Sequence, residues 1–98
     1  MKIDVSSLSD MTQIVLEGRL DTTTAPELED KLKEILDSVT NLEFDMTKLD
    51  YISSAGLRVL LGAHKAISKV GKMVIKNVNP NIMEVFEVTG FIDILNIE

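Results

Sequence analysis

The chain has no cysteine and a single histidine, His64, among its 98 residues. Without cysteine it cannot form disulfides, thiolate nucleophiles or thiolate metal sites, and one histidine excludes any multi-histidine metal site. Glycine-rich phosphate loops and the nucleophile elbow are also absent. We therefore expect no metal, no cofactor and no catalytic residues, and we predict that His64 is a surface or boundary residue rather than a catalytic base.

Basic residues are few, because 10 Lys and Arg stand against 16 Asp and Glu, which gives a net charge of −6. So acidic a chain is a poor binder of polyphosphates and is repelled by anionic lipid, so we expect no nucleic-acid partner and no membrane insertion. The charge is uneven: residues 1–50 have a balance of −7 and residues 51–98 a balance of +1. This asymmetry indicates either a surface for a partner or an edge that is simply acidic.

Long hydrophobic runs are missing as well. The first ten residues have no apolar segment after Lys2 and do not resemble a signal peptide. The stretch from Ala55 to Ala66 contains Arg58, His64 and Lys65, and it is too short to span a bilayer. We therefore expect a cytoplasmic protein with one domain over residues 1–98, since this length suits a single ordinary core.

Hydrophobic periodicity predicts an α/β fold of the order β-β-α-β-α-β-α-β. The expected elements are strands at 3–8 and 12–16, a helix at 24–39, a strand at 42–46, a loop at 47–53, a helix at 54–70, a strand at 72–78, a short helix at 79–90, and a last strand or tail at 91–95. Thr24 is predicted to cap the first helix, and Gly71 to cap the end of the second. The result is an open mixed sheet with a hairpin, mostly parallel later strands and helices packed on it.

The segment from Asp50 to Arg58 joins the end of a predicted strand to the start of a helix. Ser54 is predicted to be the N-cap, where its hydroxyl accepts a hydrogen bond from a free backbone N–H. Ala55 and Gly56 leave the first turn without bulk, so the helix N-terminus is open to a protein partner and favours negative charge. Spacing alone favours a simpler interpretation, in which Ser54 is only a cap and Gly56 only a close-packing residue.

Together with its surroundings, this segment resembles the signature of the STAS domain, most closely that of bacterial anti-sigma-factor antagonists. The matching residues are Phe44-Asp45-Met46 at a strand end, Leu49 to Ile52, Ser53-Ser54-Ala55-Gly56-Leu57 at a helix start, Gly18, Leu20, Asp21 and Ala25 earlier in the chain, and Gly90-Phe91 near its end. The resemblance spans essentially the whole chain. There are two departures, since the usual Asp before the phosphoserine is Ser53 here and the usual Ser or Thr after it is Ala55.

The resemblance implies that Ser54 is phosphorylated, with Ser53 as the runner-up. In this family the unphosphorylated protein binds an anti-sigma factor, so that the sigma factor is released and transcription is regulated indirectly. The anti-sigma factor is often a serine kinase that phosphorylates the antagonist and ends the binding, and a phosphatase resets the switch. The implied partners are thus an anti-sigma factor with kinase activity and a phosphatase, and we expect the free chain to be a monomer and not an enzyme.

The residues expected to contact the partner surround the two serines. They are Asp21, Asp45, Ser53, Ala55, Gly56, Arg58, Gly62 and Lys65. Arg58, Gly62 and Lys65 share one helix face by their spacing, and a solvated face is the alternative interpretation. Asp21 and Asp45 are expected near Ser54 at neighbouring strand ends, where they would repel a phosphate. Met46, Leu49 and Ile52 are predicted to belong to the core rather than to an interface.

Other functions fit part of the pattern. A STAS module of a stress-signalling scaffold or of a lipid-transport complex would have the same serine motif but not use it. A receiver-like domain phosphorylated on Asp45 needs an acidic pair near Asp21 and a lysine at the last strand, and the sequence has neither. An enzyme that used Asp21 and Asp45 as acid and base would lack a cluster of residues to position its substrate.

Overall fold

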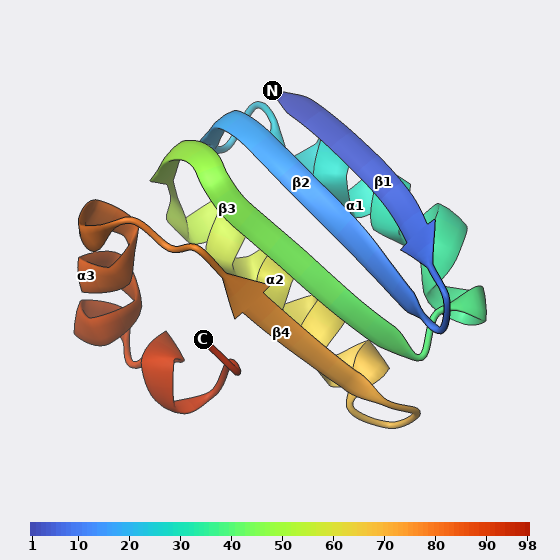
Figure 1. Ribbon diagram of the computed structural model, residues 1–98. Coiled ribbons are helices and arrows are strands. Elements are labelled where there is room, and N and C mark those ends of the chain that lie inside the picture. The colour runs from blue at the N-terminus through green and yellow to red at the C-terminus, as the bar shows by residue number, and fades with distance from the viewer.

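A four-stranded sheet in the order β1-β2-β3-β4 forms one layer of the computed structural model, which describes residues 1–98 (Figure 1). The strands are β1 (Lys2–Leu8), β2 (Met11–Leu20), β3 (Asn41–Ile52) and β4 (Lys72–Lys76). β1 and β2 form an antiparallel hairpin, whereas β2, β3 and β4 are parallel to one another. The predicted open mixed sheet is therefore confirmed.

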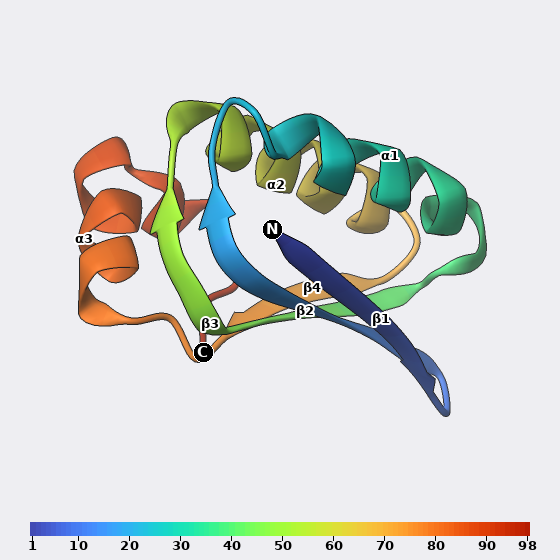
Figure 2. The same ribbon diagram turned by 90° about the horizontal axis from the view of Figure 1, so that it is seen from above.

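Two helices cover one face of this sheet. α1 (Ala25–Ile35), extended by the short 3₁₀ helix η1 (Leu36–Ser38), connects β2 to β3, and α2 (Ser54–Ile67) connects β3 to β4. Figure 2 shows both helices on the same side, while α3 (Pro80–Thr89) lies beside the sheet and the opposite face carries no helix. No helix has both the length and the apolar character that a membrane span requires.

The hydrophobic core lies between the sheet and these helices. Alternate residues of β2 and β3 point into it, because successive side chains of a strand face opposite sides; among them are Ile14, Leu16, Leu20, Leu42, Phe44 and Met46. The predicted core residues Met46, Leu49 and Ile52 are 0%, 1% and 3% exposed, so that prediction is confirmed. The face that α1 and α2 cover is thus the apolar one.

β3 is longer than the sequence pattern predicts. Residues 47–53 were expected to be a loop, but the strand continues to Ile52, where it pairs with Leu20. The β2–β3 register shifts between Val15 and Glu17 and again between Gly18 and Arg19. Such irregularities interrupt the alternation of apolar and polar residues, so a period-two pattern ends too early. The next helix nevertheless begins at Ser54, where it was predicted to begin.

The ends of the later elements also differ in detail. α2 ends at Ile67, and Val70 is 61% exposed rather than buried. Gly71 does not have the left-handed backbone of a helix cap; it is needed because an added Cβ would lie 1.7 Å from the Thr40 carbonyl oxygen. The last segment forms the 3₁₀ helix η2 (Phe91–Asp93) and a tail with a single bridge from Ile97 to Ile75. Of the two predicted alternatives, a last strand or a tail, the structure has the tail.

Candidate functional site

Two connections meet at the carboxyl ends of β2 and β3. Leu20 pairs with Ile52, and the Ser53 N–H donates to the Leu20 carbonyl oxygen at 2.9 Å. The loop that starts at Asp21 therefore lies beside the start of α2. Parallel strands bring their carboxyl ends to the same edge of the sheet, which is where α/β folds usually place their binding sites.

The backbone at this junction turns from strand to helix at Ser53. This residue is extended (φ −103°, ψ 175°), its carbonyl oxygen accepts from the Leu57 N–H at 3.0 Å, and its hydroxyl accepts from the Gly56 N–H at a long 3.5 Å. Ser53 is thus the N-cap, and the prediction that Ser54 has this role is wrong by one residue. Ser54 is the first helical residue, is exposed, and its hydroxyl makes no hydrogen bond within the chain.

Gly56 faces inward and not toward a partner. It is buried, and an added Cβ would lie 2.7 Å from Leu20 Cγ and 3.0 Å from Ile52 Cγ1. The first turn of α2 therefore rests directly on the ends of β2 and β3. The expected direct contact of Gly56 with a partner is corrected to a positioning role, because a buried glycine offers no surface. It fixes where Ser54 lies.

Asp21 is held in place by the turn that starts α1. Its Oδ1 accepts from the Thr23 hydroxyl at 2.8 Å and from the Thr23 and Thr24 N–H groups at 3.0 and 3.1 Å. These hydrogen bonds, first that from the Thr23 hydroxyl, lower the pKa of Asp21. Thr24 was predicted to cap α1 with its side chain, but its hydroxyl donates to the Arg19 carbonyl oxygen at 2.7 Å instead. A fixed, ionised carboxylate thus lies next to Ser53.

Arg19 and Tyr51 form a pair beside this carboxylate that sequence reasoning missed. They are opposite each other in the β2–β3 register, and the guanidinium carbon of Arg19 lies 4.2 Å from the centre of the Tyr51 ring. Arg19 Nε is also 3.6 Å from Asp21 Oδ2. The only signal in the sequence was an arginine two residues before Asp21, and its partner could not be found without the extended β3. Arg19 therefore already has two partners.

Asp45 lies far from this junction, contrary to expectation. It is seven residues before Ile52 in the same strand, which corresponds to roughly 20 Å. It accepts from the Thr47 hydroxyl and N–H at 2.6 and 2.9 Å and from Asn77 Nδ2 at 3.2 Å, and the first of these lowers its pKa most. Because Asp45 is not at a strand end, it does not contribute to the field around Ser54.

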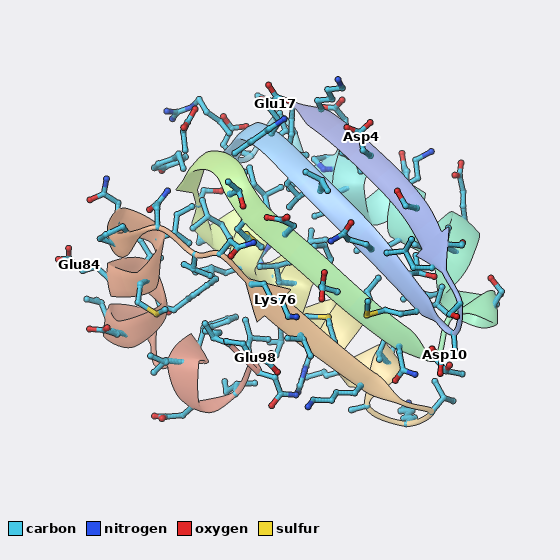
Figure 3. The ribbon with its side chains drawn as sticks, in the orientation of Figure 1. Asp4, Asp10, Glu17, Lys76, Glu84 and Glu98 are labelled. Carbon is cyan, nitrogen blue, oxygen red and sulfur yellow. The ribbon has the colours of Figure 1, made fainter.

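Asp45 instead belongs to the helix-free face of the sheet, where a second polar cluster is located. Glu43 is only 8% exposed, and it binds Lys76 Nζ at 3.1 Å and Gln13 Nε2 at 2.7 Å. Figure 3 is viewed onto this face and shows Lys76 with Glu98 nearby. The hydrogen bond to Glu43 raises the pKa of Lys76. Glu43 and Asp45 thus both have their hydrogen-bond partners within this face.

A groove between α1 and α2 begins at Ala55, the residue after the two serines, and extends along α2. Its first part, of about 150 Å³, is lined by Thr22, Ala25, Pro26, Glu29, Ala55, Arg58 and Val59, and a second part of about 290 Å³ continues past Gly62. Arg58 lines both parts, is exposed, and makes no ion pair, whereas Glu29 is 3.6 Å from Lys33 Nζ. Lys65 is exposed farther along α2, outside the groove. The structure thus brings Ala55, Arg58 and Gly62 together near Ser54.

Comparison with known proteins identifies the family. The STAS domain model matches residues 2–98. BtrV of Bordetella bronchiseptica, which is named as an anti-sigma factor antagonist, is 36% identical over 96 residues that cover 96% of this chain and 83% of BtrV.

Solved structures of such proteins have the same fold. An anti-sigma factor antagonist from Mycobacterium paratuberculosis superposes with a TM-score of 0.90 at 21% identity, covering 98% of this chain and 83% of the other. The Bacillus cell fate determinant SpoIIAA in its phosphorylated form superposes with a TM-score of 0.77 at 20% identity, covering 99% and 91% of the two chains. The chain therefore belongs to the STAS domain family, and its relatives include anti-sigma factor antagonists.

Proposed function

We propose that this chain acts as an anti-sigma factor antagonist that binds an anti-sigma factor while Ser54 is unmodified and releases it when Ser54 is phosphorylated. The anti-sigma factor is proposed to be the serine kinase. In the reaction the γ-phosphoryl group of ATP is transferred to Ser54 Oγ, a P–O bond forms, the hydroxyl proton is lost and ADP leaves. A phosphatase would hydrolyse the phosphate ester and restore binding.

The observation that favours Ser54 over Ser53 is the state of their hydroxyl groups. Ser53 is partly buried and its hydroxyl caps α2, whereas Ser54 is exposed with a free hydroxyl on the first helical turn. A kinase can therefore phosphorylate the Ser54 hydroxyl without unfolding the start of α2. That a similar protein, SpoIIAA, is known in a phosphorylated form supports the same chemistry for this chain.

The physical chemistry of the site explains why a phosphate would end the binding. Phosphorylation adds about −1.5 to −2 charges at neutral pH, and a helix N-terminus stabilises such charge by about 0.3–1 kcal/mol. The modified chain should therefore stay folded. Burying the same anion under a partner without full compensation costs several kcal/mol, and Asp21 adds repulsion. Since the interface penalty exceeds the local gain, affinity should fall.

The proposed contact surface consists of exposed and partly buried residues around the serine. Asp21, Ala55, Arg58 and Gly62 form its centre at the groove, and Lys65 at its margin is expected to affect the association rate more than the final affinity. Asp45 and Gly56 are not part of this surface, because Asp45 lies far from Ser54 and Gly56 is buried. This surface has both a fixed carboxylate and a free arginine, so the complementary partner needs both signs of charge.

The decisive experiment is incubation of the chain with candidate anti-sigma kinases and ATP, followed by mapping of the modified residue. We expect phosphate on Ser54, its loss in Ser54→Ala, and its retention in the matched variant Ser53→Gly, which keeps an acceptable N-cap. Binding assays with the unmodified and modified chains then measure the release. Phosphate on neither serine, or equal affinity of both forms, would refute the proposal.

A further inference from the structure

Arg58 is the free cation of the groove. Two other cations at or near the site have carboxylate partners: Arg19 contacts Asp21, and Lys33 contacts Glu29. Arg58 makes no ion pair although it lines both parts of the groove, and the first turn of α2 contains no acidic residue. Its guanidinium is therefore available to an anion that arrives at the site.

The position of Arg58 relative to Ser54 makes a phosphate on Ser54 a suitable anion for this guanidinium. The two residues are four apart on α2, so they lie on the same face with their Cβ atoms roughly 5–6 Å from each other. Ser54, which would carry the anion, precedes the cation Arg58 along the helix, and this is the more favourable order for an ion pair four residues apart. The planar guanidinium can bind two phosphate oxygens at once, and an arginine side chain is long enough to span this separation.

We infer that a phosphate on Ser54 is bound in cis by Arg58, and that this pair withdraws the guanidinium from the groove. The inference rests on the proposed function insofar as Ser54 is the modified residue. In the unmodified chain Arg58 is free to meet a carboxylate of the partner. In the modified chain the same side chain is engaged at the start of α2, while the phosphate retains negative charge that the pair does not neutralise. Phosphorylation thus adds an anion and removes a cation from the binding surface in one step.

The cis pair can be tested without kinase or partner. Phosphoserine is introduced at position 54 during translation, and the second pKa of its phosphate is measured by ³¹P NMR in the original chain and in Arg58→Gln, Arg58→Lys and Lys69→Gln. Arg58→Gln should raise this pKa by about 0.2–0.4 pH units, and Arg58→Lys by less. Lys69→Gln is the matched control, because it removes an exposed cation just past the end of α2, roughly 20 Å from the start of this helix, and it should leave the pKa unchanged. Equal values in the original chain and Arg58→Gln would overturn the inference.

A second arm separates this inference from the proposed function. In the unmodified chain, Arg58→Gln should weaken binding to the anti-sigma factor about tenfold, but in the phosphorylated chain it should have little further effect, because Arg58 is already withdrawn. If the two effects multiply independently, the cis pair does not control binding and the inference fails. If no form of the chain binds an anti-sigma factor, the proposed function fails while the NMR result still decides the cis pair.

Discussion

The start of α2 and the helix-free face of the sheet both contain charged side chains, but they satisfy them differently. On the helix-free face, Glu43 has Lys76 and Gln13 as partners, and Asp45 has Thr47 and Asn77. At the start of α2, Ser54 and Arg58 are exposed and have none. Carboxylates with partners inside the chain hold parts of the fold together, whereas groups without such partners are available to a binding protein or a modifying enzyme.

The largest expected effect is on affinity, which should depend on the start of α2 and not on the sheet. Ser54→Asp places a carboxylate at the start of α2 and should lower affinity for the anti-sigma factor about a hundredfold, or about 2.7 kcal/mol, while stability stays nearly unchanged. Ser6→Asp is the matched control, since it makes the same change at an exposed strand position away from the groove. Isothermal titration calorimetry measures the affinity of both variants for the anti-sigma factor. Equal losses in the two variants would show that net charge, and not the site, controls binding.

The next effect is on the free energy of unfolding, which should depend on the helix-free face of the sheet. Glu43→Ala leaves the partly buried Lys76 and Gln13 without their shared acceptor and should destabilise the chain by about 1–3 kcal/mol with unchanged affinity. Glu34→Ala removes an exposed pair with Lys31 and should cost less than about 1 kcal/mol. Urea unfolding gives both values. A loss of binding in Glu43→Ala at a concentration where the chain is folded would contradict the division of roles.

Two glycines of α2 offer a finer comparison within the site. An added Cβ at Gly56 would approach Leu20 and Ile52, so Gly56→Ala should destabilise the chain by about 1–2 kcal/mol and also displace Ser54. An added Cβ at Gly62 meets nothing within 4 Å, so Gly62→Ala should stabilise the helix by up to about 1 kcal/mol. If Gly62 contacts the partner, this stabilised variant should nevertheless bind more weakly. Thermal unfolding and calorimetry together test this, and unchanged binding would remove Gly62 from the surface.

The sequence predicted the hairpin, the mixed sheet, the core of β3 and the position of Ser54 near a helix start, because these follow from periodicity and a local motif. It placed Asp45 near Ser54 because the strand was thought to end at Met46. That error arose from the register shifts in the β2–β3 pair, which are properties of two strands together and leave no regular pattern in either one. The Arg19–Tyr51 pair was missed for the same reason. Thr24 does precede α1 as predicted, but its hydroxyl donates to the Arg19 carbonyl oxygen and does not cap the helix, which depends on a turn geometry that the sequence alone does not specify.

The smallest expected effect concerns acid, where the two regions should behave alike. The pKa values of Asp21 and Asp45 are both lowered in the folded chain, first by the hydroxyls of Thr23 and Thr47. A carboxyl whose folded pKa is below its unfolded value stabilises the fold above the unfolded pKa, and this contribution is lost as pH falls through the folded pKa. Asp21→Asn and Asp45→Asn should therefore be less stable than the original chain at pH 6, and the difference should shrink below about pH 4. Urea midpoints measured between these values test the prediction. Both groups remain partly accessible to solvent, so the effects should be small. A difference that stays constant with pH would mean that the ionised carboxylate is not what holds the turn.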